Sequence, residues 1–202
     1  MGQKILGAVF LAAGGLMILG AAVMMIYNHH IEVQAKEISQ NTVMQLDSQT
    51  EETVFQGKNE PVNPIFDSEK NMPEKEVDGN IYIGILEIPS IKRKLPVISS
   101  WDYEKLKISP CRYAGSVYQD NLVIAAHNYK SHFKGIEELS AGTEIYFTDA
   151  ESNQFVYRIE STGLILPNQN DVLVSEGEWD LTLFTCNNSG SARWVVRCIK
   201  SE

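Results

Sequence analysis

The sequence predicts an all-β domain, an antiparallel barrel or sandwich, that follows an N-terminal transmembrane helix. Residues 5–27 carry no charge, and from residue 80 onward short runs of β-branched and aromatic residues alternate with turn residues. The 202 residues therefore divide into a short N-terminus (1–4), an anchor (5–27), a stalk (28–79) and one compact domain (80–202).

The apolar run at 5–27 is long enough to cross a bilayer. As a helix it spans about 34 Å, against about 30 Å of hydrocarbon, and it exceeds the core of a signal peptide. Lys4 precedes the run, so the N-terminus is expected in the cytoplasm and the rest of the chain outside. A cleaved signal peptide, with Gly20 and Ala22 as a small-residue cleavage site, is the alternative.

Residues 28–79 indicate a flexible acidic stalk. They hold eleven acidic and four basic side chains and prolines at 61, 64 and 73. Such a segment buries too little apolar surface to offset its ordering entropy. Its first part, to about Leu46, could extend the membrane helix.

The domain at 80–202 contains seven expected strands and two brief helical candidates. The strands are 81–88, 94–99, 121–127, 144–149, 155–165, 181–186 and 192–199, and the helical candidates are 102–107 and about 134–140. About 123 residues suffice for one hydrophobic core.

Composition excludes some functions. The net charge is −9 and no basic cluster is visible, which argues against nucleic-acid binding. The three cysteines show no Cys-x-x-Cys spacing and no nearby pair of histidines, so neither a metal nor a cofactor is expected. An odd number leaves at least one thiol without a partner in the chain.

Three residues near strand ends carry the candidate chemistry. Cys186 ends an apolar strand and opens into a polar loop, which makes a thiol both rigid and reachable. His127 ends another apolar run and could meet Cys186 across the sheet. Arg193 begins the last strand seven residues after the thiol. An imidazole can protonate a leaving amine, and a guanidinium supplies permanent donors where charge develops.

These residues resemble a known family. The string Thr182-Leu183-Phe184-Thr185-Cys186, with an arginine on the next strand, resembles the signature of the sortases. Ala125-Ala126-His127 is similar to their histidine strand, and Ile83–Pro89 to their opening strand. The resemblance covers roughly 80–202 and implies an eight-stranded sortase-like β-barrel with one or two short helices, preceded by the N-terminal transmembrane helix.

The resemblance also implies an activity. Sortases cleave a C-terminal sorting signal of the Leu-Pro-x-Thr-Gly kind between Thr and Gly, and an amine of a peptidoglycan precursor or pilin resolves the thioacyl intermediate. It makes Cys186 the nucleophile, His127 the acid and base, and Arg193 the group that stabilises the oxyanion or holds substrate backbone. Thr185, with Ala126 and Asn128, is then expected at the bound substrate. The implied partners are sorting-signal proteins, the amine acceptor and the membrane.

Several alternatives stay open. The short loop after Cys186 and the lack of large insertions favour a class D-like sortase, and no residue cluster indicates calcium. An L,D-transpeptidase-like enzyme and a non-enzymatic anchored β-barrel are the competing readings. His132 competes with His127 for the acid and base role. Cys111 and Cys198 are expected to be buried thiols.

Strand alternation separates the two arginines of the last strand. Arg193 and Arg197 share one face but lie about 13 Å apart, so only one can sit at the thiol. Antiparallel pairing of the last two strands would put Arg193 nearest Cys186 and Arg197 near Thr182.

Overall fold

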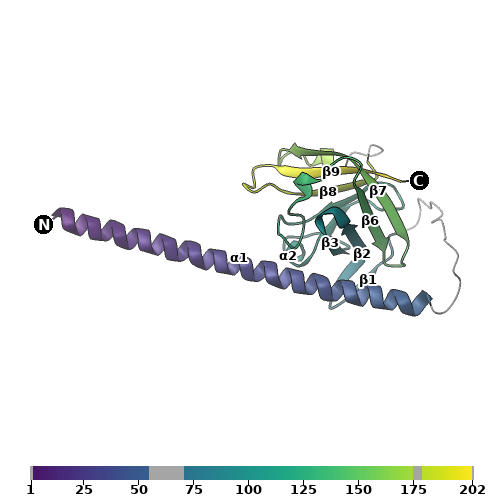
Figure 1. The fold of residues 1–202 in the computed structure, drawn as a ribbon, viewed down its shortest axis with the longest axis horizontal. Coiled ribbons are helices and arrows are strands. Elements are labelled where there is room, and N and C mark those ends of the chain that lie inside the picture. Colours follow the sequence, from purple (N-terminus) through teal and green to yellow (C-terminus); the bar gives the residue numbers. More distant parts are fainter. Residues whose placement is uncertain (1, 55–70, 175–178, 202) are drawn as a thin grey trace.

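The computed structural model describes residues 2–54, 71–174 and 179–201, which form a long N-terminal helix and a β-barrel packed against the distal half of that helix (Figure 1). Helix α1 is Gly2–Val54. The strands are β1 Lys75–Val77, β2 Asn80–Ile88, β3 Arg93–Ile98, β4 Cys111–Ala114, β5 Leu122–Ala125, β6 Glu144–Asp149, β7 Gln154–Ile165, β8 Leu181–Cys186 and β9 Arg193–Lys200.

Eight strands close the barrel. The order is β2-β3-β4-β5-β8-β9-β7-β6, and β6 pairs back onto β2, so no edge remains open between them. The short strand β1 pairs with the start of β2. The predicted eight-stranded barrel is thus confirmed.

Alternation of side chains fills the barrel. In β6, Ile145 and Phe147 are fully buried while the residues between them are half exposed. They join Ile83, Leu86 and other residues of β2, β5 and β8 in one interior core. Gly84 lets β2 approach β6 closely, because its φ is 149° and an added Cβ would collide with the Thr148 carbonyl.

The pairing is mixed rather than purely antiparallel as the residue pattern suggests. β5 runs parallel to β8, with Ala125 opposite Phe184, and β3 meets β4 in parallel at Ile98 and Cys111. Strands β1 and β4 were not predicted. Both are only three or four residues long, too short for an alternating pattern to register.

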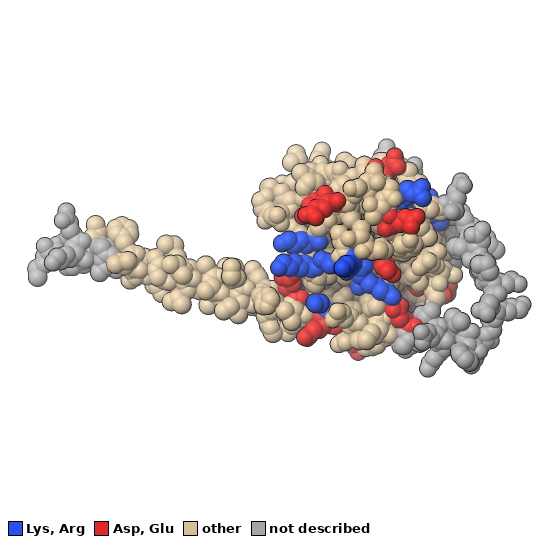
Figure 2. Space-filling model, in the orientation of Figure 1, with Lys and Arg blue, Asp and Glu red and all other residues tan. Residues whose placement is uncertain are grey.

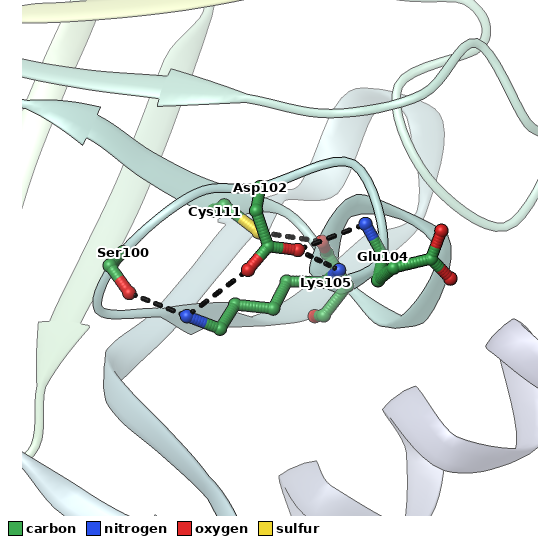
Figure 3. Close-up of polar contacts among 6 residues, drawn as sticks. Ser100, Asp102, Glu104, Lys105 and Cys111 are labelled. Atoms are coloured by element: carbon green, nitrogen blue, oxygen red, sulfur yellow. Dashed lines mark hydrogen bonds and ion pairs between the residues drawn. The ribbon is translucent and has the colours of Figure 1, made fainter.

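Among the described residues, four short helices lie in the connections: η1 Pro89–Ile91, α2 Lys105–Ile108, η2 Ile136–Glu138 and η3 Asp171–Val174. Asp102 fixes the start of α2, because its Oδ1 accepts hydrogen bonds from the backbone N–H groups of Glu104 and Lys105 at 2.9 and 2.8 Å (Figure 3). The Lys105 ammonium lies 3.4 Å from the same carboxylate and donates to Ser100.

The segment expected to be a stalk is largely ordered on the barrel. Helix α1 continues to Val54, and Met72 and Val77 are buried, while 55–70 lie outside the described residues. One face of α1 is buried, at Ala35, Ser39, Thr42, Val43 and Leu46. This face recurs every three or four positions, but small and polar residues fill most of it, so an apolar periodicity does not mark it.

In the first half of α1, the large apolar side chains that the structure describes are exposed. Phe10, Leu16 and Met25 are 69%, 70% and 76% exposed. Within the described residues, α1 alone is long and apolar enough to cross a membrane. It is therefore a candidate membrane anchor.

Candidate active site

Cys186 is the exposed thiol of the chain. Residues 181–185 of β8 are buried, and Cys186 at the strand end is exposed. The strand is held on both sides, by β5 and by β9, so the thiol is rigidly placed yet reachable.

Arg193 lies directly opposite Cys186. The antiparallel register of β8 and β9 pairs these two residues and also pairs Thr182 with Arg197, as the sequence analysis expects. A tight loop makes the return: the Asn187 N–H donates to the Ala192 carbonyl at 2.9 Å, and Gly190 adopts a φ of 71°. The Arg193 Nη1 donates to the Pro167 carbonyl, just after the end of β7, at 2.6 Å, which restrains the guanidinium.

His127 flanks the thiol on the other side. The parallel register pairs Ala125 with Phe184, and the Ala126 N–H donates to the Phe184 carbonyl at 3.1 Å. Continuing this register two residues further, His127, which lies just past the end of β5, comes level with Cys186 at the end of β8. The strand spacing of about 4.8 Å places the imidazole in the neighbourhood of the thiol.

The surroundings of His127 favour its neutral form. Burial lowers the pKa of His127, and the positive charge of Lys107 on α2 lowers it further. Its ring stacks on Tyr129, with centroids 4.7 Å apart. An imidazole with a reduced pKa is a stronger acid, which suits proton donation to a leaving amine.

The three residues expected at the substrate lie around this trio, but two are buried. Thr185 is 1% and Ala126 7% exposed, and the Thr185 hydroxyl donates to the Ala126 carbonyl at 2.8 Å. This bond ties the thiol strand to the histidine strand. Asn128 is half-buried, and its Nδ2 donates to Asn188 Oδ1 at 2.9 Å, joining the two loops that leave the site.

Comparison with known proteins gives the family. The family model of the Sortase domain matches residues 86–201, more than half of the chain. The chain belongs to the sortase family.

Individual relatives agree with this assignment. Sortase A of Bacillus anthracis is 27% identical over 161 residues, which cover 76% of this chain and 75% of the relative. The structure of a Clostridium perfringens sortase D5 transpeptidase matches 84% of this chain and 99% of its own, at a TM-score of 0.57 and 19% identity. Sortase A from Corynebacterium diphtheriae matches 61% of this chain, at a TM-score of 0.55 and 22% identity, and the chain spans 62% of that structure's length.

The protein is thus a sortase-type cysteine transpeptidase. This assignment excludes the two competing readings, an L,D-transpeptidase and a non-enzymatic scaffold. The relatives include sortases of classes A, C and D, so the class D-like subclass stays a prediction.

Arg197 serves a different part of this sortase from Arg193. It is 8% exposed, and its Nη1 donates to Thr182 Oγ1 at 2.8 Å. The guanidinium also donates to the carbonyls of Val172 and Leu173 in η3. These bonds anchor the connection between β7 and β8.

The remaining thiols and His132 are enclosed. Cys111 and Cys198 are fully buried, as expected, and burial raises the pKa of Cys111 to about 12 and that of Cys198 higher still. His132 is fully buried, and burial lowers its pKa to about 4, with the nearby charge of His127 acting in the same direction. A ring that stays neutral and enclosed at pH 7 does not fit the acid and base role.

Sequence reasoning did not anticipate the residues that support the trio. Tyr129 stacks on the imidazole, Pro167 supplies the carbonyl that holds Arg193, and Lys107 acts on His127 from a short helix. None belongs to a motif. Of the three, Tyr129 was the easiest to predict from the sequence, because an aromatic ring two residues after His127 can stack on the imidazole.

Proposed function

We propose that this sortase is anchored in the membrane by α1 and joins proteins to an amine. The substrates would carry a C-terminal sorting signal of the Leu-Pro-x-Thr-Gly kind. The observation that supports the proposal is the exposed Cys186 at the end of β8, with Arg193 paired to it on β9 and His127 just past the end of the neighbouring strand β5.

The proposed first step is acylation. Neutral His127 accepts the proton of the Cys186 thiol, and the resulting thiolate attacks the Thr carbonyl of the signal, forming the carbon–sulfur bond and a tetrahedral oxyanion. Guanidinium N–H groups of Arg193 stabilise that oxyanion or hold the adjacent substrate backbone. When the intermediate collapses, the carbon–nitrogen bond breaks and His127 donates its proton to the departing glycine amine.

The second step reverses the proton transfer. The acceptor amine, from a cell-wall precursor or a pilin, attacks the thioacyl carbon. Neutral His127 removes the proton from the attacking nitrogen, and the thiolate leaves. The buried bond between Thr185 and the Ala126 carbonyl supports both steps by keeping thiol and imidazole in register. Substrate contacts are proposed for Asn128, which is accessible at the same edge.

Mass spectrometry tests the chemistry. The full chain in detergent is incubated with a small library of sorting-signal peptides and amines. We expect a thioacyl adduct on Cys186 and a transfer product, and neither with Cys186→Ala. The matched controls Cys111→Ala and Cys198→Ala should keep the adduct if they remain folded. Turnover by folded Cys186→Ala would refute the mechanism.

The proposed topology places the N-terminus in the cytoplasm and the barrel outside, because Lys4 precedes the apolar run. Protease added to intact protoplasts should remove the barrel. Protection of residues 80–202 under those conditions would contradict the orientation.

A further inference from the structure

A cavity of about 380 Å³ lies between α1 and the barrel. Residues between His29 and Gln40 of α1 form one wall. Residues 92–95, at the start of β3, form the opposite wall. Lys130 and Ser131, which follow His127 in the same loop, close one end. The site lies outside the catalytic trio but shares a loop with it.

Basic side chains dominate this cavity. Lys36, Lys92, Arg93, Lys94 and Lys130 line it, and Lys and Arg side chains gather where the helix meets the barrel (Figure 2). Against these five cations the lining holds one carboxylate, Glu32.

Few of these charges are neutralised. The Lys94 ammonium pairs with Asp47 at 2.6 Å. The Glu32 carboxylate accepts the Lys130 backbone N–H at 2.8 Å, rather than an ammonium. In the described part of the chain, the ammonium groups of Lys36, Lys92 and Lys130 form neither an ion pair nor a hydrogen bond. An anion bound in the cavity would lie among these three unpaired ammonium groups.

Among the described residues, the Arg93 guanidinium donates hydrogen bonds to backbone carbonyls rather than to a carboxylate. Its Nη1 donates to the Ile91 carbonyl at 2.9 Å and its Nε to the His132 carbonyl at 3.2 Å. These bonds fix the plane of the guanidinium, and among residues 2–54, 71–174 and 179–201 no carboxylate pairs with it. A fixed guanidinium is well suited to a phosphate group.

Two buried hydroxyls in the lining also lack partners. Ser39 is 3% exposed, and neither its Oγ nor that of Ser131 makes a hydrogen bond. A buried polar group without a partner costs about 1–3 kcal/mol. Phosphate oxygens would accept from both hydroxyls, which accounts for polar residues at these enclosed positions.

The position along α1 identifies the source of the phosphate. The apolar run ends at Tyr27, so His29 lies about 3 Å and Lys36 about 14 Å beyond it along the axis. Lipid headgroups occupy roughly 5–8 Å outside the hydrocarbon, and a lysine stem reaches several ångströms further. The near end of the cavity is therefore at headgroup level if α1 spans the membrane.

We propose that this cavity binds the phosphate group of an anionic membrane lipid. The lipid bridges α1 to β3 and to the loop of His127, and so fixes the catalytic barrel against its anchor. The proposal rests on the membrane anchoring proposed above, but not on the transfer chemistry.

Native mass spectrometry of the full chain tests it. The protein is released from mixed micelles containing equal amounts of phosphatidylglycerol and phosphatidylcholine. We expect retained phosphatidylglycerol in clear excess. Loss of two unpaired cations in Lys36→Gln/Lys92→Gln should reduce retention about a hundredfold or more, since two charge-assisted hydrogen bonds to the phosphate are lost. The single change Ser39→Ala, which alters no charge, should weaken retention severalfold. It provides an independent test if the double variant does not fold.

The control is Lys105→Gln/Lys107→Gln, the same charge change on α2 outside the cavity. Equal loss in the control and cavity variants would mean general attraction and would overturn the site. Binding of soluble glycerol phosphate with no preference for phosphatidylglycerol would overturn the lipid source. Cys186→Ala should retain lipid normally, so failure of the transfer chemistry and failure of this proposal are seen separately. Co-flotation of the chain with liposomes tests the anchor independently.

Discussion

Arg193 and Arg197 share a strand and a face, yet their surroundings assign them different tasks. Arg193 is half-buried, opposite the thiol, and holds one carbonyl. Arg197 is enclosed and bonded to Thr182 and to η3. This contrast makes the pair a test of the proposed mechanism.

We expect Arg193→Ala to lower the transpeptidation rate about 10²–10³-fold, the usual cost of losing one oxyanion donor. Arg193→Lys should rescue little, because an ammonium lacks the planar fork. Arg197→Ala should instead lower the free energy of unfolding by about 2–3 kcal/mol, since it leaves buried carbonyls unpaired. Steady-state kinetics and denaturant unfolding measure both. An inactive but stable Arg197→Ala beside a normal Arg193→Ala would reverse the assignment.

His132 should make stability depend on pH. Its pKa is about 4 in the folded protein and 6.5 as a free side chain, so the unfolded chain binds more protons between these values. Neutral His132 therefore contributes about 3 kcal/mol to the free energy of unfolding above pH 6.5, and this contribution is lost as the pH falls toward 4.

The matching variant is His132→Gln, which removes the titration. From pH 7 to pH 4, the free energy of unfolding of this variant should fall by about 3 kcal/mol less than that of the unchanged protein. Chemical denaturation at both pH values gives the comparison. Parallel losses in the two proteins would show that His132 does not titrate in this range.

At the scale of elements, the longer strands were predictable, but of their pairings only that of β8 with β9 was expected. The runs that become β2, β7 and β8 carry β-branched and aromatic residues, and side-chain alternation placed Cys198 opposite to Arg197. Pairing direction depends on connections, which no local pattern contains. The catalytic candidates could be predicted because they lie at or just beyond the ends of recognisable strands. Pro167, in a loop, and Lys107, on a one-turn helix, lie on no such strand and were not predicted.

The sequence indicated that the helix could continue to about Leu46, but it did not indicate that this part of α1 packs on the barrel. Val43 and Leu46 join a second core with Val77, Tyr82 and Ile98 on the outside of the barrel. The helix is also tied by polar contacts, since Gln45 Nε2 donates to Asp78 at 3.4 Å and Lys94 pairs with Asp47. It is thus a structural part of the catalytic unit.

Leu46→Ala should therefore destabilise the barrel itself. Leu46 is 5% exposed, and removing its side chain should cost about 2–3 kcal/mol. The tryptophans all lie in the barrel portion, so their fluorescence during denaturation in detergent reports the effect. Met44→Ala, at a position 61% exposed, should cost less than about 0.5 kcal/mol. Equal, small effects would mean that helix and barrel are energetically independent.

For the whole molecule, the edge of the barrel that carries the candidate active site lies alongside α1. The loop between β8 and β9 lies on the side of the barrel toward the N-terminal half of the helix (Figure 1). Glu32 bonds the loop that follows His127. Burial raises the pKa of Tyr129, and Glu32 and Tyr27 of α1 lie near enough to raise it further. The catalytic edge is thus level with residues 27–32, immediately beyond the apolar run.

A longer helix should separate the enzyme from substrates in the membrane. Inserting about two helical turns, seven Ala and Gln residues, between Asn28 and His29 raises the barrel by about 10 Å while nearly preserving the rotational phase of the face that packs on it. We expect unchanged turnover of a soluble signal peptide, because the catalytic trio and its packing are untouched. Turnover of the same peptide on a short lipid tether in liposomes should fall about tenfold, because the tether no longer delivers it at high local concentration. The same seven residues inserted between Gly2 and Gln3 should affect neither rate. A tethered substrate processed normally by the lengthened enzyme would show that the height of the barrel does not govern access.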